Sequence, residues 1–349
     1  MRFVAAFFGI RQATRQIATR CLSVVVVLCL TLRAETTAKG PERGDASASP
    51  GLAGVIQPLI QAHKGKVAVA VKNLRTGESY RYHADEVMPT ASLIKFPVMI
   101  ETYRQAAAGQ VDLAARLTLK ATDKVPGSGI LTAHFSAGAT FSLRDAVRLM
   151  IAFSDNTATN LVLDAIGIGA TSATMEALGY PNTKIHSKVF RRDTSVFPER
   201  SKQFGLGSTT AAEMIRLCEE LHHKRLVSPA ASEAMLEHLR ACDDKEKFPR
   251  FLPPGTKIAF KTGSLADTRT AAGIIDCPAG PVALCVLSRD NEDQRWVPDN
   301  AGNVLCAAVA REVYHYFQES RPALARPATA PSSKDHSNAP TAGQATPGR

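Results

Sequence analysis

The chain has 349 residues, 45% of them hydrophobic, which is enough to bury the core of one domain of about 250 to 300 residues. This composition excludes a disordered chain and a disulfide-dense one. The formal charge of +10 does not indicate nucleic-acid binding, because five arginines in the first 34 residues supply half of it and the remaining positive charges are not interleaved with aromatic residues.

Residues 1–34 have the composition of a secretory signal peptide. They contain five arginines and no acidic residue, and an apolar run extends from Cys21 to Leu32. A run of this length is short for a membrane span. We therefore expect export to the periplasm or out of the cell, with membrane anchoring only if the peptide is not cleaved.

Two further segments are predicted to lie outside the folded domain. Residues 35–48 are polar and rich in small side chains, which indicates a flexible leader. Residues 319–349 are rich in proline and alanine, a composition that cannot build a core and predicts a disordered tail. The folded domain is therefore predicted at residues 49–318.

The domain is predicted to open with a helix and a hairpin. Ser49 and Pro50 have the pattern of a helix start, and the helix should run to about His63 with a kink at Pro58. Alternating valines then predict a first strand, and a turn containing Gly77 leads into a second; the two cover residues 66–74 and 79–83.

The middle of the chain has helical patterns. Ser142-Leu-Arg-Asp145 resembles a capping box and opens a helix that ends near Ser154. Further helices are predicted over residues 157–166 and from Thr210 and Ser228.

Strands return near the C-terminus, at residues 257–261, 271–277 and 282–288, and a closing helix is predicted over residues 301–317. The fold class is therefore α/β (α+β), with a five-stranded antiparallel sheet flanked by helices and a mostly helical second lobe. The sheet lobe would comprise about residues 49–108 and 250–318, and the helical lobe about 109–249. A cleft between the lobes would be the place for a site.

Ser92 precedes Lys95 by three residues, so the two side chains would share one face of a helix. A serine is a poor nucleophile until a base removes its proton, and a lysine can be that base when its pKa is lowered. Alone, the pair is better explained as a helix cap followed by a surface lysine. Leu93, Ile94 and Phe96 make the helix apolar nearly all round, which predicts that Lys95 is buried.

Two further motifs follow Ser92 along the chain. Ser154-Asp155-Asn156 begins 62 residues after Ser92, and Lys261-Thr262-Gly263-Ser264 closes a strand 107 residues after Ser154. Lys-Thr-Gly alone would be an ordinary strand end that turns into a loop. The three motifs in this order are rare by chance.

With these motifs the chain resembles the penicillin-recognising serine hydrolases, and most closely the class A β-lactamases, over roughly residues 50–318. The resemblance implies that Ser92 is the acylated nucleophile and Lys95 its base or hydrogen-bond activator. Ser154 would pass a proton to the leaving lactam nitrogen. Asn156 would hold the amide of the substrate's side chain, and Asp155 would brace the loop.

The resemblance also implies a site for the substrate's carboxylate. Lys261 and Thr262 would hold this group, and the backbone amides of Ser92 and Ser264 would form the oxyanion hole. Lys261 would also help to keep Lys95 neutral through like-charge repulsion. Arg269 either adds a second cation for the carboxylate or is an ordinary arginine at a strand end.

One loop departs from the family. There, a glutamate in a Glu-x-x-Leu-Asn context positions the water that breaks the acyl-enzyme. Arg191 and Asp193 match the salt-bridged opening of that loop, but Val196 stands in the place of the glutamate. Glu199 is either a displaced deacylation base or a surface carboxylate paired with Arg200.

We therefore expect an exported serine β-lactamase that forms an acyl-enzyme on Ser92. The unusual loop leaves two alternatives, a cell-wall D-Ala-D-Ala peptidase and a β-lactam-binding protein that is acylated without turnover. The expected partner is a small β-lactam or a peptidoglycan stem peptide, with no nucleic acid and no stable protein partner. The protein is expected to be a monomer, and no metal or organic cofactor is implied.

Overall fold

The computed structural model describes residues 49–319. The predicted signal peptide (1–34), the predicted leader (35–48) and all of the predicted tail except Glu319 lie outside the described residues. Within residues 49–319, no helix is both long and apolar enough to cross a bilayer.

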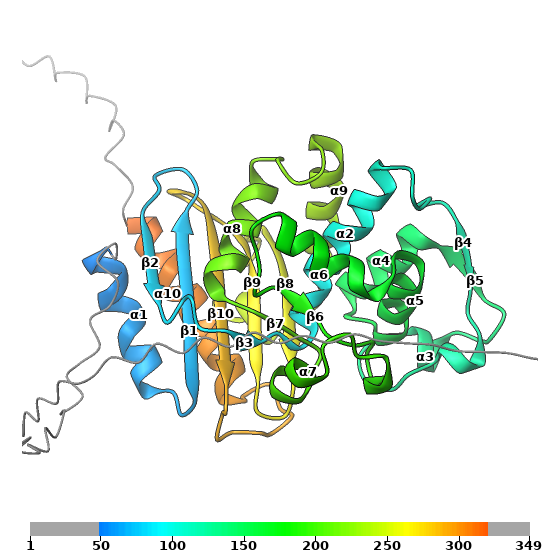
Figure 1. Cartoon of the computed structure of the whole chain (residues 1–349). Coiled ribbons are helices and arrows are strands. Elements are labelled where there is room, and N and C mark those ends of the chain that lie inside the picture. The colour runs from blue at the N-terminus through cyan, green and yellow to red at the C-terminus, as the bar shows by residue number, and fades with distance from the viewer. Residues whose placement is uncertain (1–48, 320–349) are drawn as a thin grey trace, which may run out of the picture. The chain divides into compact units, whose positions relative to one another are not determined.

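A five-stranded antiparallel sheet in the order β2-β1-β10-β9-β8 forms the centre of the fold (Figure 1). Its register aligns Val69 of β1 with Val286 of β10 on one side and with Tyr82 of β2 on the other. This sheet confirms the predicted fold class, including its assembly from both ends of the chain. The strands are β1 (Lys66–Asn73), β2 (Ser79–Tyr82), β8 (Ile258–Ser264), β9 (Arg269–Cys277) and β10 (Gly280–Arg289).

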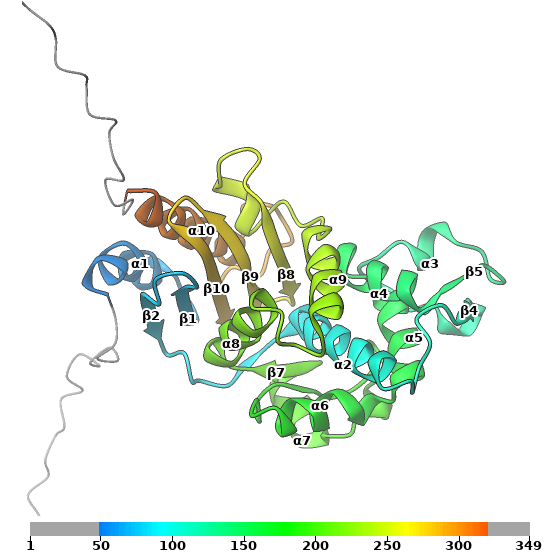
Figure 2. The same ribbon diagram turned by 90° about the horizontal axis from the view of Figure 1, so that it is seen from above.

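The two faces of the sheet are covered by different helices (Figure 2). Val67, Val69 and Val71 of β1 belong to a hydrophobic cluster with α1 (Pro50–Ala62) and α10 (Ala301–Glu319). Ala68 and Ala70 point to the opposite face, whose cluster includes α8 (Ala211–His222). The alternation follows from the two-residue period of a strand. The first helix continues through Pro58 to Ala62 as one element.

The remaining helices pack beside the sheet and surround α2 (Lys95–Ala107), in which ten of thirteen residues are buried. The predicted capping box at the start of α4 is present, because Ser142 and Asp145 exchange hydrogen bonds. These helices are α3 (Leu131–His134), α4 (Leu143–Ala152), α5 (Asn156–Ile166), α6 (Ile168–Ala177), α7 (Pro198–Phe204) and α9 (Pro229–Arg240).

Short elements complete the described part of the chain. Strands β3 (Met88–Pro89), β7 (Gly207–Thr209) and β6 (Lys184–Ile185) form one small sheet, and β4 (Arg116–Thr118) pairs with β5 (Thr140–Ser142). The 3₁₀ helices are η1 (Ala91–Ile94), η2 (Ala121–Asp123), η3 (Arg192–Thr194) and η4 (Phe248–Phe251).

Two helices pack against partners in a different lobe from the one predicted for their residues. Residues 95–107 were expected with the sheet, yet α2 packs against α4, α5 and α6. Residues 211–222 were expected with the helical lobe, yet α8 packs against β1, β9 and β10. Both helices have extensive buried faces, and a pattern of buried positions does not say which partner covers them.

The cysteines within residues 49–319 are buried and unpaired; they are Cys218, Cys242, Cys277, Cys285 and Cys306.

Candidate active site

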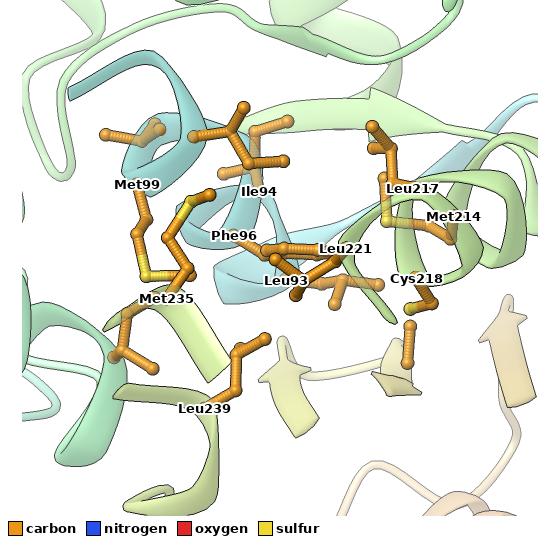
Figure 3. Packing of buried hydrophobic residues seen from close by; sticks show 14 of the residues in the cluster. Leu93, Ile94, Phe96, Met99, Met214, Leu217, Cys218, Leu221, Met235 and Leu239 are labelled. Atoms are coloured by element: carbon orange, nitrogen blue, oxygen red, sulfur yellow. The ribbon is translucent and has the colours of Figure 1, made fainter. Parts of the chain in front are cut away.

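Ser92 lies in η1, a tight turn that leads directly into α2. Its neighbours Leu93, Ile94 and Phe96 are fully buried and pack among residues of α8 and α9, including Leu221 (Figure 3). Ser92 itself is only partly buried and lines a cleft. The hydrophobic residues around the serine therefore hold its backbone rigidly while its hydroxyl group faces the cleft.

The edge strand β8 passes very close to this turn. A Cβ on Gly263 would lie 2.4 Å from the Thr90 carbonyl oxygen and 2.7 Å from the Ser92 amide nitrogen. Thr270 of the neighbouring strand donates a hydrogen bond of 2.8 Å to the same Thr90 oxygen. Glycine is required because the two backbones meet there. The contact places Thr262 and Ser264 of β8 beside the serine.

Lys95 is fully buried beneath the cleft, as predicted. Its Nζ donates to the Ser154 carbonyl oxygen at 2.6 Å and to Asn156 Oδ1 at 2.8 Å. Burial lowers the pKa of Lys95 well below its ordinary value, and the positive charge of Lys261 lowers it further, against an opposing effect of Asp155. In its neutral form the amine can satisfy both of these acceptors with its two hydrogens and keep a lone pair that can accept a proton.

Ser154 lies between the two lysines of the site. Its Oγ is 3.3 Å from Lys95 Nζ and 3.1 Å from Lys261 Nζ. Its backbone adopts a left-handed conformation, with φ of 52°, which is unfavourable for a residue other than glycine. Because its Oγ is close to both amino groups, the Ser154 hydroxyl can relay a proton between Lys95 and a group in the cleft.

Asp155 and Asn156 fix the segment of residues 126–131, which packs against them. One oxygen of Asp155 caps α5, and the other accepts the amides of Ile130 and Leu131 at 2.7 and 2.8 Å. Asn156 donates to the Pro126 carbonyl oxygen at 3.0 Å. Asp155 thus braces the loop, as the resemblance implied.

Lys261 is also fully buried, and it donates to Thr262 O at 2.8 Å as well as to Ser154. Burial lowers the pKa of Lys261, and the positive charge of Lys247 lowers it further, whereas the negative charge of Asp244 opposes both effects. The site therefore holds two buried amino groups whose charges disfavour one another, which is the arrangement that keeps one of them neutral.

Lys247 is a cleft-lining cation that the sequence reasoning missed. Only 3% of its side chain is exposed, and its Nζ donates to Asp244 at 2.8 Å. Burial alone would raise the pKa of Asp244, but Lys247 and the Thr262 hydroxyl outweigh burial and lower it. In the sequence these residues form part of an ordinary mixed-charge run over 243–247, which gives no sign that two of them point inward.

Arg269 lines the cleft and is almost completely buried. Its guanidinium group donates to the carbonyl oxygens of Leu265, Thr268 and Arg295, and its positive charge lies 5.0 Å from the centre of the Trp296 ring. These contacts favour the second of the two expectations for Arg269. Through these carbonyl oxygens the arginine ties the loop after β8 to residues 295–296.

Glu199 does not lie at the cleft. It is the second residue of α7, its side chain is 84% exposed, and it pairs with Lys202 at 2.8 Å. The expected pairing with Arg200 is wrong, because Arg200 donates to Ser208 and Asn182. A short helix begins at Pro198 and turns the carboxylate to solvent, so the geometry does not support Glu199 as a deacylation base.

The predicted salt-bridged opening of the same loop also differs. Arg191 donates to the Thr122 carbonyl oxygen at 2.8 Å, and it forms no ion pair with Asp193 among the described residues. The segment is held instead by Asn160, which exchanges hydrogen bonds of 2.8 and 3.0 Å with the backbone of Val189.

The cleft has a volume of about 760 Å³ and gathers most of the predicted site residues. Lys95 lies just beneath it, and Glu199 is the predicted site residue that is not at the cleft. In the part of the chain that the structure describes, the carboxylates lining the cleft are Asp243, Asp244 and Glu246, and no group of His, Cys, Asp and Glu could hold a metal ion. The predicted residues that line it are Ser92, Ser154, Asn156, Lys261, Thr262, Ser264 and Arg269.

The structure combines a five-stranded antiparallel sheet, packed against helices, with a Ser-x-x-Lys turn at the cleft. This is the fold of the penicillin-recognising serine hydrolases, as the motifs predicted. The profile of the β-lactamase enzyme family matches residues 51–317. The chain therefore belongs to the β-lactamase enzyme family.

Three relatives place the chain within this family. The crystal structure of a β-lactamase from Sphaerobacter thermophilus DSM 20745 has a TM-score of 0.68 and 30% identity, covering 78% of this chain and 98% of that one. A β-lactamase of Streptomyces cellulosae is 29% identical over 262 residues, which are 72% of this chain and 82% of the relative. A mutant of PBP-A, in an acyl-enzyme complex with penicillin G, has a TM-score of 0.66 and 25% identity, covering 77% and 96% of the two chains.

Proposed function

We propose that the protein is a serine β-lactamase of the class A type, which opens β-lactams through an acyl-enzyme on Ser92. The observation that carries the proposal is the state of Lys95. This lysine is fully buried, its pKa is lowered, and its Nζ donates to Ser154 O and Asn156 Oδ1. The named activities of the relatives and the acyl-enzyme formed by PBP-A support the same chemistry.

In the acylation step, Ser92 Oγ attacks the lactam carbonyl carbon and its proton passes to the neutral amine of Lys95. The backbone amides of Ser92 and Ser264 would stabilise the negative oxygen that develops. When the carbon–nitrogen bond breaks, the lactam nitrogen takes a proton from Ser154, which regains one from Lys95. Lys95 is then neutral again.

The substrate's carboxylate is proposed to bind at the Lys261 end of the cleft. Lys261 and Thr262 lie there on β8, and Lys247 adds a third polar group within the same cleft. Asn156, which also lines the cleft, would hold the amide of the acyl side chain.

Hydrolysis of the ester needs a water molecule and a base beside Ser92. By the resemblance, Val196 stands where the family has its glutamate. Glu199 faces solvent, and the described carboxylates of the cleft lie in residues 243–246. We therefore assign the deacylation base to Lys95 as well, since acylation returns it to the neutral state. A water would lose its proton to Lys95 as its oxygen bonds to the acyl carbon. The bond from that carbon to Ser92 Oγ would then break, and Ser92 Oγ would take the proton back from Lys95.

Turnover of a chromogenic cephalosporin by the purified protein tests this function. We expect hydrolysis with many turnovers per protein molecule, and none with Ser92→Ala. A single stoichiometric burst without further turnover would contradict the β-lactamase proposal and favour a protein that is only acylated. Release of D-alanine from a D-Ala-D-Ala peptide, without cephalosporin turnover, would instead favour the peptidase.

We also propose that residues 1–34 direct export, on the composition of that segment alone. Fractionation of cells that express the full chain should place the activity outside the cytoplasm, with a mature N-terminus near Ala34 or Ala38. An intact N-terminus on membrane-bound protein would indicate an anchor instead.

A further inference from the structure

Phe190 is an aromatic residue that lines the cleft, and neither its exposure nor its backbone conformation favours folding. Its side chain is 63% exposed, so it contributes little to any core. Its φ is 56°, in the left-handed region where a bulky residue is rare. An exposed residue held in such a conformation indicates a function for which the strain is retained.

The backbone on both sides of Phe190 forces this conformation. Residues 188–191 form a tight turn, closed by a hydrogen bond of 3.2 Å from the Arg191 amide to the Lys188 carbonyl. Val189 is tied to Asn160 on one side, and Arg191 to Thr122 on the other. The third position of such a turn favours glycine or asparagine, yet phenylalanine occupies it here.

The ring lies on the wall of the cleft that Asn156 helps to form. A Cβ on Gly127 would be 3.3 Å from a carbon of the Phe190 ring and 2.8 Å from Asn156 Nδ2. All three residues line the cleft. Phe190, Gly127 and Asn156 therefore form one continuous surface in the cleft.

We propose that the Phe190 ring is a specificity-determining surface, which binds an aromatic acyl group of the substrate and speeds acylation by such substrates. The proposal rests on the acylation of Ser92 proposed above. A substrate whose amide lies at Asn156 would carry its acyl group past Gly127 onto the ring. Stacked or edge-on contact between two aromatic rings would raise the acylation rate constant about two- to tenfold.

The test compares two substrates with the same nucleus, benzylpenicillin with its aromatic acyl group and 6-aminopenicillanic acid with none. The second-order acylation rate constant is measured with each by rapid-quench mass spectrometry, which does not depend on deacylation. Phe190→Asn removes the ring and keeps a residue that tolerates the left-handed region. Phe190→Tyr keeps the ring, and Phe135→Ala removes a partly exposed phenylalanine that does not line the cleft.

We expect Phe190→Asn to slow acylation by benzylpenicillin about two- to tenfold while acylation by 6-aminopenicillanic acid changes less than about twofold. Phe190→Tyr and Phe135→Ala should preserve the wild-type ratio. Melting of Phe190→Asn should occur at the wild-type temperature or about 2 °C above it, because strain is relieved. An equal loss with both substrates, or no change in the ratio, overturns this inference alone. A wild-type protein that neither penicillin acylates overturns the proposed function, and this inference with it.

Discussion

The close approach of β8 to the Ser92 turn predicts a large effect of one added methyl group. In Gly263→Ala, the new Cβ would lie 2.4 Å from Thr90 O and 2.7 Å from Ser92 N, whereas an ordinary contact begins at 3.4 Å. Gly263 has no positive φ, so alanine is allowed by its backbone and the effect is purely steric. One of the two backbones must therefore move by about 1 Å.

A displacement of this size at the nucleophile slows acylation by about 100-fold, because reacting groups must be held to within a fraction of an ångström. Overpacking lowers the free energy of unfolding by about 1 to 3 kcal/mol. Acylation by benzylpenicillin, followed by rapid-quench mass spectrometry, measures the first effect, and denaturant unfolding measures the second.

Gly273→Ala is the matched control for this variant. Gly273 lies in the same sheet, and its Cβ would be 2.3 Å from Ala259 O, but it does not line the cleft. This variant should lose about as much stability while acylating within about threefold of wild type. The account of the turn is refuted if Gly263→Ala acylates at the wild-type rate, or if Gly273→Ala is slowed equally.

Three further variants test other parts of the site. Because the pKa of Lys95 is lowered in the fold, the unfolded chain binds more protons and wild-type stability rises with pH above the folded pKa of Lys95. The melting temperature of Lys95→Met minus that of wild type should therefore be larger at pH 5 than at pH 9. The variant should also acylate about 10²- to 10⁴-fold more slowly. A difference in melting temperature that is independent of pH would be inconsistent with a depressed pKa of Lys95. Lys247→Gln should raise KM for penicillins about tenfold or more with a smaller change in kcat, because it removes a cation from the cleft. Steady-state kinetics measures both constants, and circular dichroism checks that the fold is intact. An unchanged KM would exclude a contact between Lys247 and the substrate's carboxylate. Glu199→Gln should leave the lifetime of the acyl-enzyme within about twofold of wild type, because an 84% exposed carboxylate paired with Lys202 contributes little; a tenfold longer lifetime by mass spectrometry would restore it as the base.

The sheet and the catalytic turn could be predicted because their signals are local. Alternating valines gave β1 its two faces, and Leu93, Ile94 and Phe96 indicated that Lys95 had no solvated side. Motif order then brought Ser154 and Lys261 to the same place, although 107 residues separate them. Agreement between local pattern and global fold is what makes such predictions succeed.

The remaining features of the site could not be predicted, because they depend on the direction in which individual side chains point. Lys247 and Lys245 stand two residues apart in one charged run, yet the first is buried in the cleft and the second is 74% exposed. Arg269 was open to two interpretations because the carbonyl groups that bind it come from distant loops, including Arg295. The left-handed conformation of Phe190 runs against the preference of its turn position for glycine or asparagine, so local sequence preferences do not predict it.

The central claim is that Ser92 is acylated by a β-lactam and is then released with Lys95 as the base. Time-resolved intact-mass measurement of the protein with a limiting amount of benzylpenicillin tests it most directly. The account predicts a covalent adduct that maps to Ser92, is absent from Ser92→Ala, decays to the free protein, and decays faster as pH rises through the pKa of Lys95. An adduct on another residue, or one on Ser92 that persists at every pH, would contradict it.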